Sequence, residues 1–225
     1  MPVLSVNAQP YYYETAGEGF PLLLASGLGE TISAWEPLVP LLGEICRVIA
    51  CEYRGSEVPQ QAVEQCRSTF PGPDLAALLD ALEVERLYLA ADPTAAATAL
   101  HFALQAPTRL EGVVLLGGFE DEAALAAPVR RTGERREEVD TVALADRLHA
   151  MTVPTLLLVG DQSPQHLRQS ERLAAHLPHC SRVVIAEAGA VPHREQPRRC
   201  GHAMMHFLIH CERQRHLVRG ASLLL

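Results

Sequence analysis

The chain has 225 residues, of which 48% are hydrophobic and 20% charged, a composition typical of one globular domain with a sizeable core. Its formal charge of −8, from 27 acidic and 19 basic residues, disfavours nucleic acid and anionic membrane surfaces as partners. All 19 basic residues are arginines, which excludes the lysine-dependent chemistry of Schiff-base enzymes and P-loop nucleotidases.

Short apolar segments alternate with helical patterns along the chain, which predicts a mostly parallel sheet with helices on both faces. An antiparallel hairpin is expected at one edge, from Val3 to Val6 and Tyr11 to Thr15. The further strands are expected at Leu22 to Ala25, Cys46 to Cys51, Arg86 to Ala91, Gly112 to Leu116, Thr155 to Val159 and Arg182 to Ala186. The helices are expected at Ala34 to Leu42, Asp74 to Leu82, Thr94 to Ala106, Gln165 to Leu177 and Pro197 to His216.

Residues 120–139 interrupt this alternation with an acidic stretch and then a cluster of arginines. We interpret them as an exposed connection with a short helix and no strand, because a second domain would need a longer segment. The whole chain, residues 1–225, is therefore expected to form a single domain.

Nothing in residues 1–19 has the pattern of a leader, and no apolar run reaches the roughly 18 residues of a membrane helix, so a cytoplasmic protein is expected. The six cysteines lack a C-x-x-C pair and are expected to be reduced core thiols. His202, His206 and His210 have the i, i+4 spacing of metal ligands, but no carboxylate completes a set. We expect them to face solvent, and we predict neither a metal nor a cofactor.

Several stretches resemble landmarks of the α/β-hydrolase fold superfamily, in the same order along the chain. They are Tyr12 to Gly19, Pro21 to Gly29 with Trp35, Glu52 to Gly55, Asp74 to Leu82, Val153 to Gly160 and Glu195 to Pro197. The resemblance implies a doubly wound α/β sheet whose ligands bind at the carboxyl ends of the strands. It also implies that residues 120–152 replace the lid of that family with a shorter connection.

The same resemblance implies a nucleophile on a strained G-x-S-x-G turn, then an acid, then a histidine. Counted from the matching segments, these positions fall on Pro93, Ser163 and Ala190. None of the three can play its part in a Ser-His-Asp triad. Proline also fixes φ near −65°, so we expect a relaxed helix start capped by Asp92 instead of a strained turn.

Three other side chains are alternatives for the lost groups: Asp92 as a displaced nucleophile, Asp161 as a displaced acid and His193 as a displaced base. Capping, loop and structural roles are favoured for them. The residues expected to contact a ligand are Ser26, Gly27, Leu28, Trp35 and Thr94.

The sequence thus predicts an α/β-hydrolase-like protein that binds, regulates or assembles without hydrolysing. A neutral or apolar small molecule or a protein partner is favoured, because Asp92 would weaken the attraction of a helix start for anions. The apolar residues 221–225 leave three alternatives open: they cover the groove, pair two subunits as a homodimer, or fray. The alternative functions are a lyase, cyclase or isomerase that uses His193, Asp161 or Ser26, and a divergent esterase.

Overall fold

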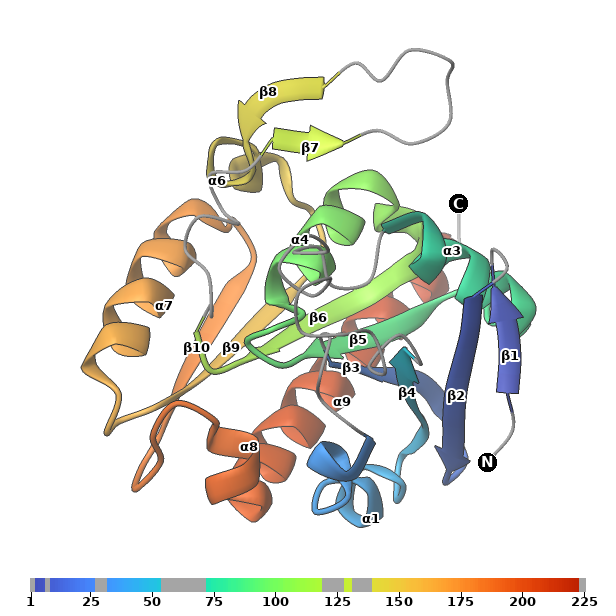
Figure 1. Ribbon diagram of the computed structural model, residues 1–225, viewed down its shortest axis with the longest axis horizontal. Helices are drawn as coiled ribbons and strands as arrows, with labels where there is room; N and C mark the ends of the chain where they lie inside the picture. Colours follow the sequence, from blue (N-terminus) through green and yellow to red (C-terminus); the bar gives the residue numbers. More distant parts are fainter. Residues whose placement is uncertain are drawn as a thin grey trace.

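The main sheet of the computed structural model has eight strands in the order β1-β2-β4-β3-β5-β6-β9-β10 (Figure 1). The structure describes residues 3–6, 9–26, 32–53, 72–118, 128–130 and 139–222. The strands are β1 (Val3–Val6), β2 (Gln9–Ala16), β3 (Phe20–Ala25), β4 (Cys46–Tyr53), β5 (Leu87–Ala91), β6 (Leu110–Leu116), β9 (Thr155–Gly160) and β10 (Cys180–Ile185). Only the pairs β1–β2 and β2–β4 are antiparallel, which confirms the predicted mostly parallel sheet with a hairpin at its edge.

The central strands are apolar on both faces because helices cover both faces of the sheet. All five residues of β5 and all six of β9 are buried. Since side chains alternate along a strand, Leu23 and Leu89 lie in one core, whereas Leu22 and Leu24 lie in the other. The first core includes buried side chains of α3, α4 and α7, and the second includes side chains of α1 and α9 (Figure 1).

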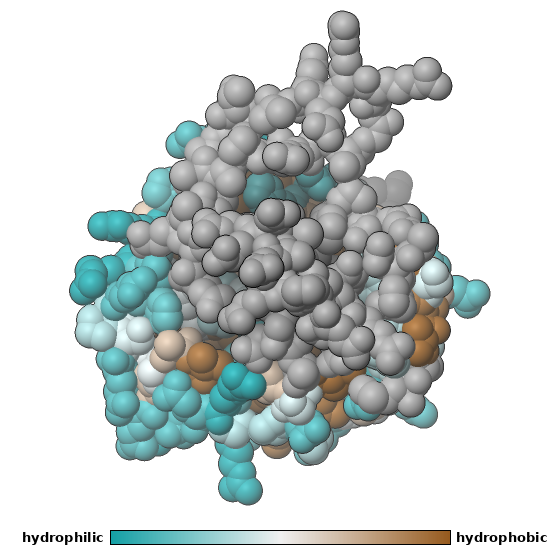
Figure 2. Space-filling model, in the orientation of Figure 1, coloured by the Kyte–Doolittle hydropathy of each residue, from teal (hydrophilic) through white to brown (hydrophobic). Residues whose placement is uncertain are grey.

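The helices that cover the sheet match the predicted positions with different boundaries. They are α1 (Val39–Leu42), α3 (Gly72–Ala81), α4 (Ala96–Gln105), α7 (Pro164–His176), α8 (Pro192–Glu195) and α9 (Pro197–Ser222). Instead of one helix from Ala34 to Leu42, the structure has a 3-10 turn, η1 (Ile32–Trp35), and then α1. Pro37, which has no N–H to donate, interrupts the helical ladder between them. The outer side of α7 is polar, and hydrophilic side chains cover that side of the molecule at the left of Figure 2.

The expectation that residues 120–139 have no strand character is wrong. β7 (Pro128–Arg130) and β8 (Val139–Ala143) pair antiparallel in a separate two-stranded sheet, at the top of Figure 1. β8 contains the β-branched residues that favour extended backbone, but the neighbouring charges hid this pattern. A short helix, α6 (Leu144–Arg147), and a 3-10 turn, η4 (Leu148–Ala150), follow β8, beyond the stretch in which the short helix was expected.

The described cysteines are core side chains, as predicted. None of Cys46, Cys51, Cys180, Cys200 and Cys211 forms a disulfide, and all but Cys180 are buried. Burial raises the pKa of the Cys46 and Cys200 thiols to about 12, which keeps them protonated and unreactive at neutral pH. Cys66 lies outside the described residues. No helix in the described part of the chain combines the length and the apolar character needed to cross a membrane.

Candidate functional site

A cavity of about 140 Å³ lies at the carboxyl ends of the central strands. Parallel α/β sheets bind their ligands at this end, so the cavity is the candidate functional site. Its walls come from η1, the turn after β5, the first turn of α7 and the segment that enters α8. The lining residues are Ala34, Asp92, Pro93, Thr94, His166, Ala190, Val191, His193 and Arg194.

The turn after β5 is held by the carboxylate of Asp92, which is only 3% exposed. Its Oδ1 accepts the backbone N–H groups of Thr94 and Ala95 at 2.9 and 3.0 Å and the Thr94 hydroxyl at 2.5 Å. Among the described non-glycine residues, only Glu83 and Glu187 have positive φ, so the backbone at Pro93 is not strained. α4 begins at Ala96, two residues later than predicted, because Asp92 caps a separate turn that precedes the helix.

Hydrogen bonds to Asp92 oppose the effect of its burial. Burial raises the pKa of the Asp92 carboxyl, and the bonds from Thr94, Ala95 and Ser26 favour the ionised form. The capping role that the sequence favours for Asp92 is thus the one in which the structure places its Oδ1. A nucleophilic carboxylate would need an oxygen that is not already bonded to three donor groups.

Ser26 and Trp35 connect this turn to α8. The indole Nε1 of Trp35 donates to Ser26 Oγ at 2.7 Å, and the Ser26 hydroxyl bonds Asp92. The Trp35 ring stacks on His193, with 4.6 Å between ring centroids and 19° between ring planes. Ser26 is buried and absent from the cavity wall, so its hydroxyl holds the strand ends together instead of facing a ligand. Trp35 supports the wall from behind His193.

His193 is the buried imidazole of the site. Its side chain is 1% exposed, and its Nδ1 has no hydrogen-bond partner among the described residues. Burial, and secondarily Arg194, lowers the pKa of His193 to about 4, so the ring is neutral at pH 7. A neutral imidazole has one N–H donor and one acceptor nitrogen, and because Nδ1 is sealed from solvent, only Nε2 can be open to a bound molecule.

His166 is a second imidazole of the cavity, and the sequence reasoning missed it. Its Nδ1 lies 3.0 Å from Ser163 Oγ, and burial lowers its pKa. A Cβ on Gly118 would lie 2.2 Å from His166 Cδ2, so glycine at the end of β6 allows this close approach. The pattern Ser-Pro-x-His at a helix start is visible in the sequence. It does not reveal that His166 packs against residue 118 at the strand ends.

Of the other residues singled out in the sequence, some line the cavity and others do not. Ala190 and Thr94 line the cavity, whereas Ser163 does not. Asp161 is exposed, and its Oδ1 accepts the Ala188 N–H at 3.3 Å, so it connects two loops away from the cavity wall. Gly27 and Leu28 lie outside the described residues.

The histidines of α9 face solvent, as the sequence predicts for them. His202, His206 and His210 are all exposed. Within the described ranges, no group of three or more His, Cys, Asp or Glu side chains is arranged to hold a metal ion. The chemistry of the site therefore has to be sought in the cavity at the strand ends.

Comparison with known proteins links the chain to hydrolases over part of its length. It is 28% identical over 119 residues to "Putative carbamate hydrolase RutD" of Azorhizobium caulinodans, covering 53% of the chain and 45% of the relative. It is 29% identical over 127 residues to 2-hydroxy-6-oxo-6-phenylhexa-2,4-dienoate hydrolase of Comamonas testosteroni, covering 54% and 44%. The chain thus spans about half the length of these relatives. No family model matches it.

Solved structures of hydrolases share the fold over nearly the whole chain. A bacterial membrane phospholipase A superposes with a TM-score of 0.73 at 19% identity, covering 94% of this chain and 86% of the other. The enol-lactonase of Burkholderia xenovorans LB400 superposes with a TM-score of 0.71 at 20% identity, covering 92% and 100%. These likenesses show a common fold for the described sheet and its helices.

Proposed function

The chain is a member of the α/β-hydrolase superfamily, and from this premise we propose that it binds a small molecule at the strand ends without hydrolysing it. The observation that carries the proposal is Pro93 in the turn after β5. This turn presents the nucleophile in the superfamily, and proline has neither a hydroxyl nor access to the strained backbone.

The chemistry of the cavity wall supports the same proposal. Pro93 and Ala190 both line the cavity, so the positions of the nucleophile and the general base contribute apolar surface. The hydroxyl groups that remain nearby bond other side chains: Ser26 bonds Trp35, Thr94 bonds Asp92 and Ser163 contacts His166. A cavity that keeps polar groups at its wall without an available nucleophile is suited to binding.

A fluorophosphonate probe together with a short-chain nitrophenyl ester tests the proposal. We expect neither labelling nor turnover above buffer, because loss of a single triad member already lowers the rate by orders of magnitude. Ser163→Ala is the informative variant, since Ser163 contacts an imidazole, and Ser181→Ala on the exposed face of β10 is its matched control. Labelling that Ser163→Ala abolishes and Ser181→Ala retains would contradict the proposal.

A second candidate is a proton-transfer enzyme such as a lyase, cyclase or isomerase. It is favoured by His166 and His193 lining one cavity with lowered pKa values, since neutral imidazoles can accept protons at pH 7. Deuterium exchange into a small enolisable ketone, cyclopentanone, distinguishes the two functions. Exchange that His193→Ala abolishes would favour the enzyme, whereas a ketone that binds without exchange would favour the binding protein.

A further inference from the structure

We propose that the ligand of the cavity is a small uncharged molecule, about the size of one six-membered ring, with a hydroxyl group that hydrogen-bonds His193. This inference rests on the proposed function, because it names the class of molecule that the non-hydrolytic site binds. Size, wall chemistry, charge and an unpartnered imidazole each contribute to it.

The volume of the cavity sets the size of the ligand. At about 140 Å³ it is close to an engineered apolar protein cavity of about 150 Å³ that binds benzene. A single ring with one substituent fills such a space. The phenylhexadienoate in the name of one relative, a phenyl ring on a six-carbon chain, would be too large for it.

The wall combines an apolar part with a few polar groups. Ala34, Pro93, Ala190 and Val191 contribute the apolar part, so most of a ring would contact carbon. Of these, Pro93 and Ala190 stand where the superfamily keeps its reactive side chains. The substitutions that remove hydrolysis therefore also enlarge the apolar surface available to a ring.

The charges of the site favour an uncharged ligand. Burial raises the pKa of the Asp92 carboxyl while the donors around it oppose that rise, and its Oδ1 is held by its own hydrogen bonds, so it is not available to pair with a cationic ligand. Both imidazoles are neutral at pH 7, because burial lowers their pKa values, so neither pairs with an anion. Arg194 also lines the cavity and would repel a cation, but it is exposed, so water and salt screen its attraction for an anion.

The polar anchor of the ligand is His193. Its side chain is 99% buried and lines the cavity; its Nδ1 is sealed from solvent without a partner among the described residues, which leaves Nε2 as the ring nitrogen for a ligand to bond. Trp35 stacks on one face of the ring and fixes its orientation. A hydroxyl group can both donate and accept, so it can pair with Nε2 in either tautomer of the neutral ring. This bond gives the buried imidazole a polar partner.

Phenol, toluene and benzoate are the probes that test the ligand class. Trp35 is the only tryptophan of the chain and stacks on His193, so its fluorescence reports on the cavity, with calorimetry as the second measurement. We expect phenol to bind, toluene to bind about tenfold more weakly because it lacks one hydrogen bond, and benzoate not to bind. Benzoate that binds as tightly as phenol would overturn the proposal.

Two variants locate the bound phenol. His193→Phe keeps an aromatic ring beside Trp35 but removes both nitrogens, so the difference between phenol and toluene should disappear. His202→Phe, on the exposed face of α9, is its control. Ala190→Leu fills the cavity from an exposed position and should abolish binding of every probe, whereas Ala186→Leu, also exposed, should not.

The outcomes separate this inference from the proposed function. Phenol binding that persists in Ala190→Leu, or a phenol preference that persists in His193→Phe, would overturn the assigned ligand class. A protein that binds no phenol and is not labelled by the fluorophosphonate would leave the non-hydrolytic function in place and refute only its ligand. Labelling by the fluorophosphonate would refute the function itself.

Discussion

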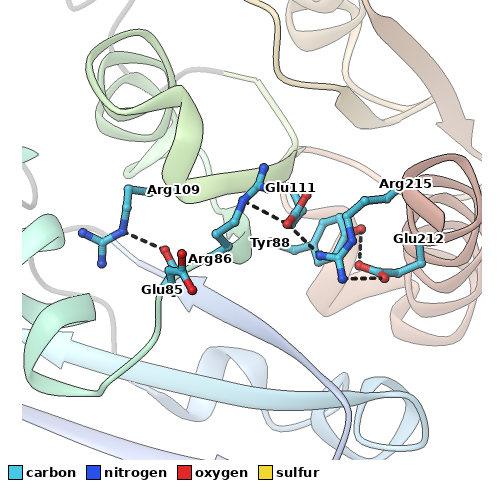
Figure 3. A network of polar contacts seen from close by, with 7 residues as sticks. All are labelled: Glu85, Arg86, Tyr88, Arg109, Glu111, Glu212 and Arg215. Carbon is cyan, nitrogen blue, oxygen red and sulfur yellow. Dashed lines mark hydrogen bonds and ion pairs between the residues drawn. The ribbon is translucent and has the colours of Figure 1, made fainter. Parts of the chain in front are cut away.

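The two ends of the parallel strands differ in how their polar side chains are paired. At the amino end, Figure 3 shows a network in which Glu111 and Glu212 contact arginines, while Arg109 donates to the backbone carbonyl of Glu85. Glu111 lies 3.0 Å from Arg86 and 2.6 Å from Arg215, and Arg215 also lies 3.3 Å from Glu212. The Tyr88 hydroxyl donates to Glu212 at 2.9 Å. This network connects β5, β6 and α9, and holding these elements together is sufficient to explain its contacts.

Both ends contain buried nitrogens without a hydrogen-bond partner among the described residues: Nε of Arg86 and Arg215 at the amino end, and Nδ1 of His193 at the carboxyl end. Asp92 is held by hydroxyl and N–H donors, but the buried His193 has an unpartnered nitrogen and faces a cavity. A buried polar group without a partner reduces the stability of the fold. The comparison indicates that charge pairs hold the amino end together, whereas at the carboxyl end a buried imidazole lines a cavity.

Lowering the pH should destabilise the fold first at the carboxyl end, through His193. Its pKa is lowered from 6.5 to about 4 in the fold, so the unfolded chain binds the proton more tightly. The stabilisation that neutral His193 contributes is complete above pH 6.5 and is lost as the pH falls to about 4. The free energy of unfolding should fall by about 3 kcal/mol over this range. Urea unfolding at several pH values measures it.

His193→Phe isolates this contribution, because it removes the titrating group and keeps an aromatic ring. The variant should lose a slope of about 1.4 kcal/mol per pH unit between pH 6.5 and 4, whatever its stability at pH 7. Asp92, whose pKa is raised, contributes a pH slope of the opposite sign to the free energy of unfolding. This contribution is present in both proteins, so it cancels when their slopes are subtracted. An unchanged slope in His193→Phe, or its loss in the exposed control His202→Phe, would contradict the assignment.

Gly117 should be the most sensitive backbone position of the site. Its φ is +91°, and a Cβ there would lie 2.6 Å from the Ala190 carbonyl oxygen and 2.8 Å from Pro93 Cγ. We expect Gly117→Ala to lower the free energy of unfolding by about 2 to 3 kcal/mol, since strain and collision add. Gly201→Ala on α9 is the matched control, because its φ is not positive and a Cβ there meets only the flexible end of the Leu41 side chain, at 2.9 Å. If the two variants cost the same, the backbone argument at Gly117 fails.

Much of the fold could be predicted because each buried strand is a short apolar segment, as Leu87–Ala91 illustrates. Counting between such segments also placed Pro93 and Ala190, which line one cavity. The stack of Trp35 on His193 could not be predicted, because it joins side chains that only the folded chain brings together. His166 was missed for the same reason, since its place depends on close packing against Gly118.

The amino-end network should respond most strongly at Glu111, which contacts two arginines and is 9% exposed. Glu111→Gln leaves Arg86 and Arg215 partly buried with a neutral neighbour. We expect a loss of about 2 kcal/mol in the free energy of unfolding, below the range for fully buried pairs because both guanidiniums reach solvent. The same change at Glu171, an exposed carboxylate 3.6 Å from Arg182, should cost less than about 0.5 kcal/mol. Equal losses in the two variants would show that Glu111 is an ordinary surface charge.

The smallest effect is expected at Tyr88, the neutral member of that network. Tyr88→Phe removes the hydroxyl that donates to Glu212, while Glu212 keeps its contact with Arg215. The ring is buried, and burial followed by Glu212 raises the pKa of the hydroxyl far above its usual range, so the group titrates nowhere near neutral pH. We therefore expect a loss of about 1 kcal/mol that is independent of pH between 6 and 9. Tyr13→Phe on β2, half-buried, is the control and should change stability by less than half as much. A larger loss than in Glu111→Gln would mean that the hydroxyl, and not the charges, holds β5 to α9.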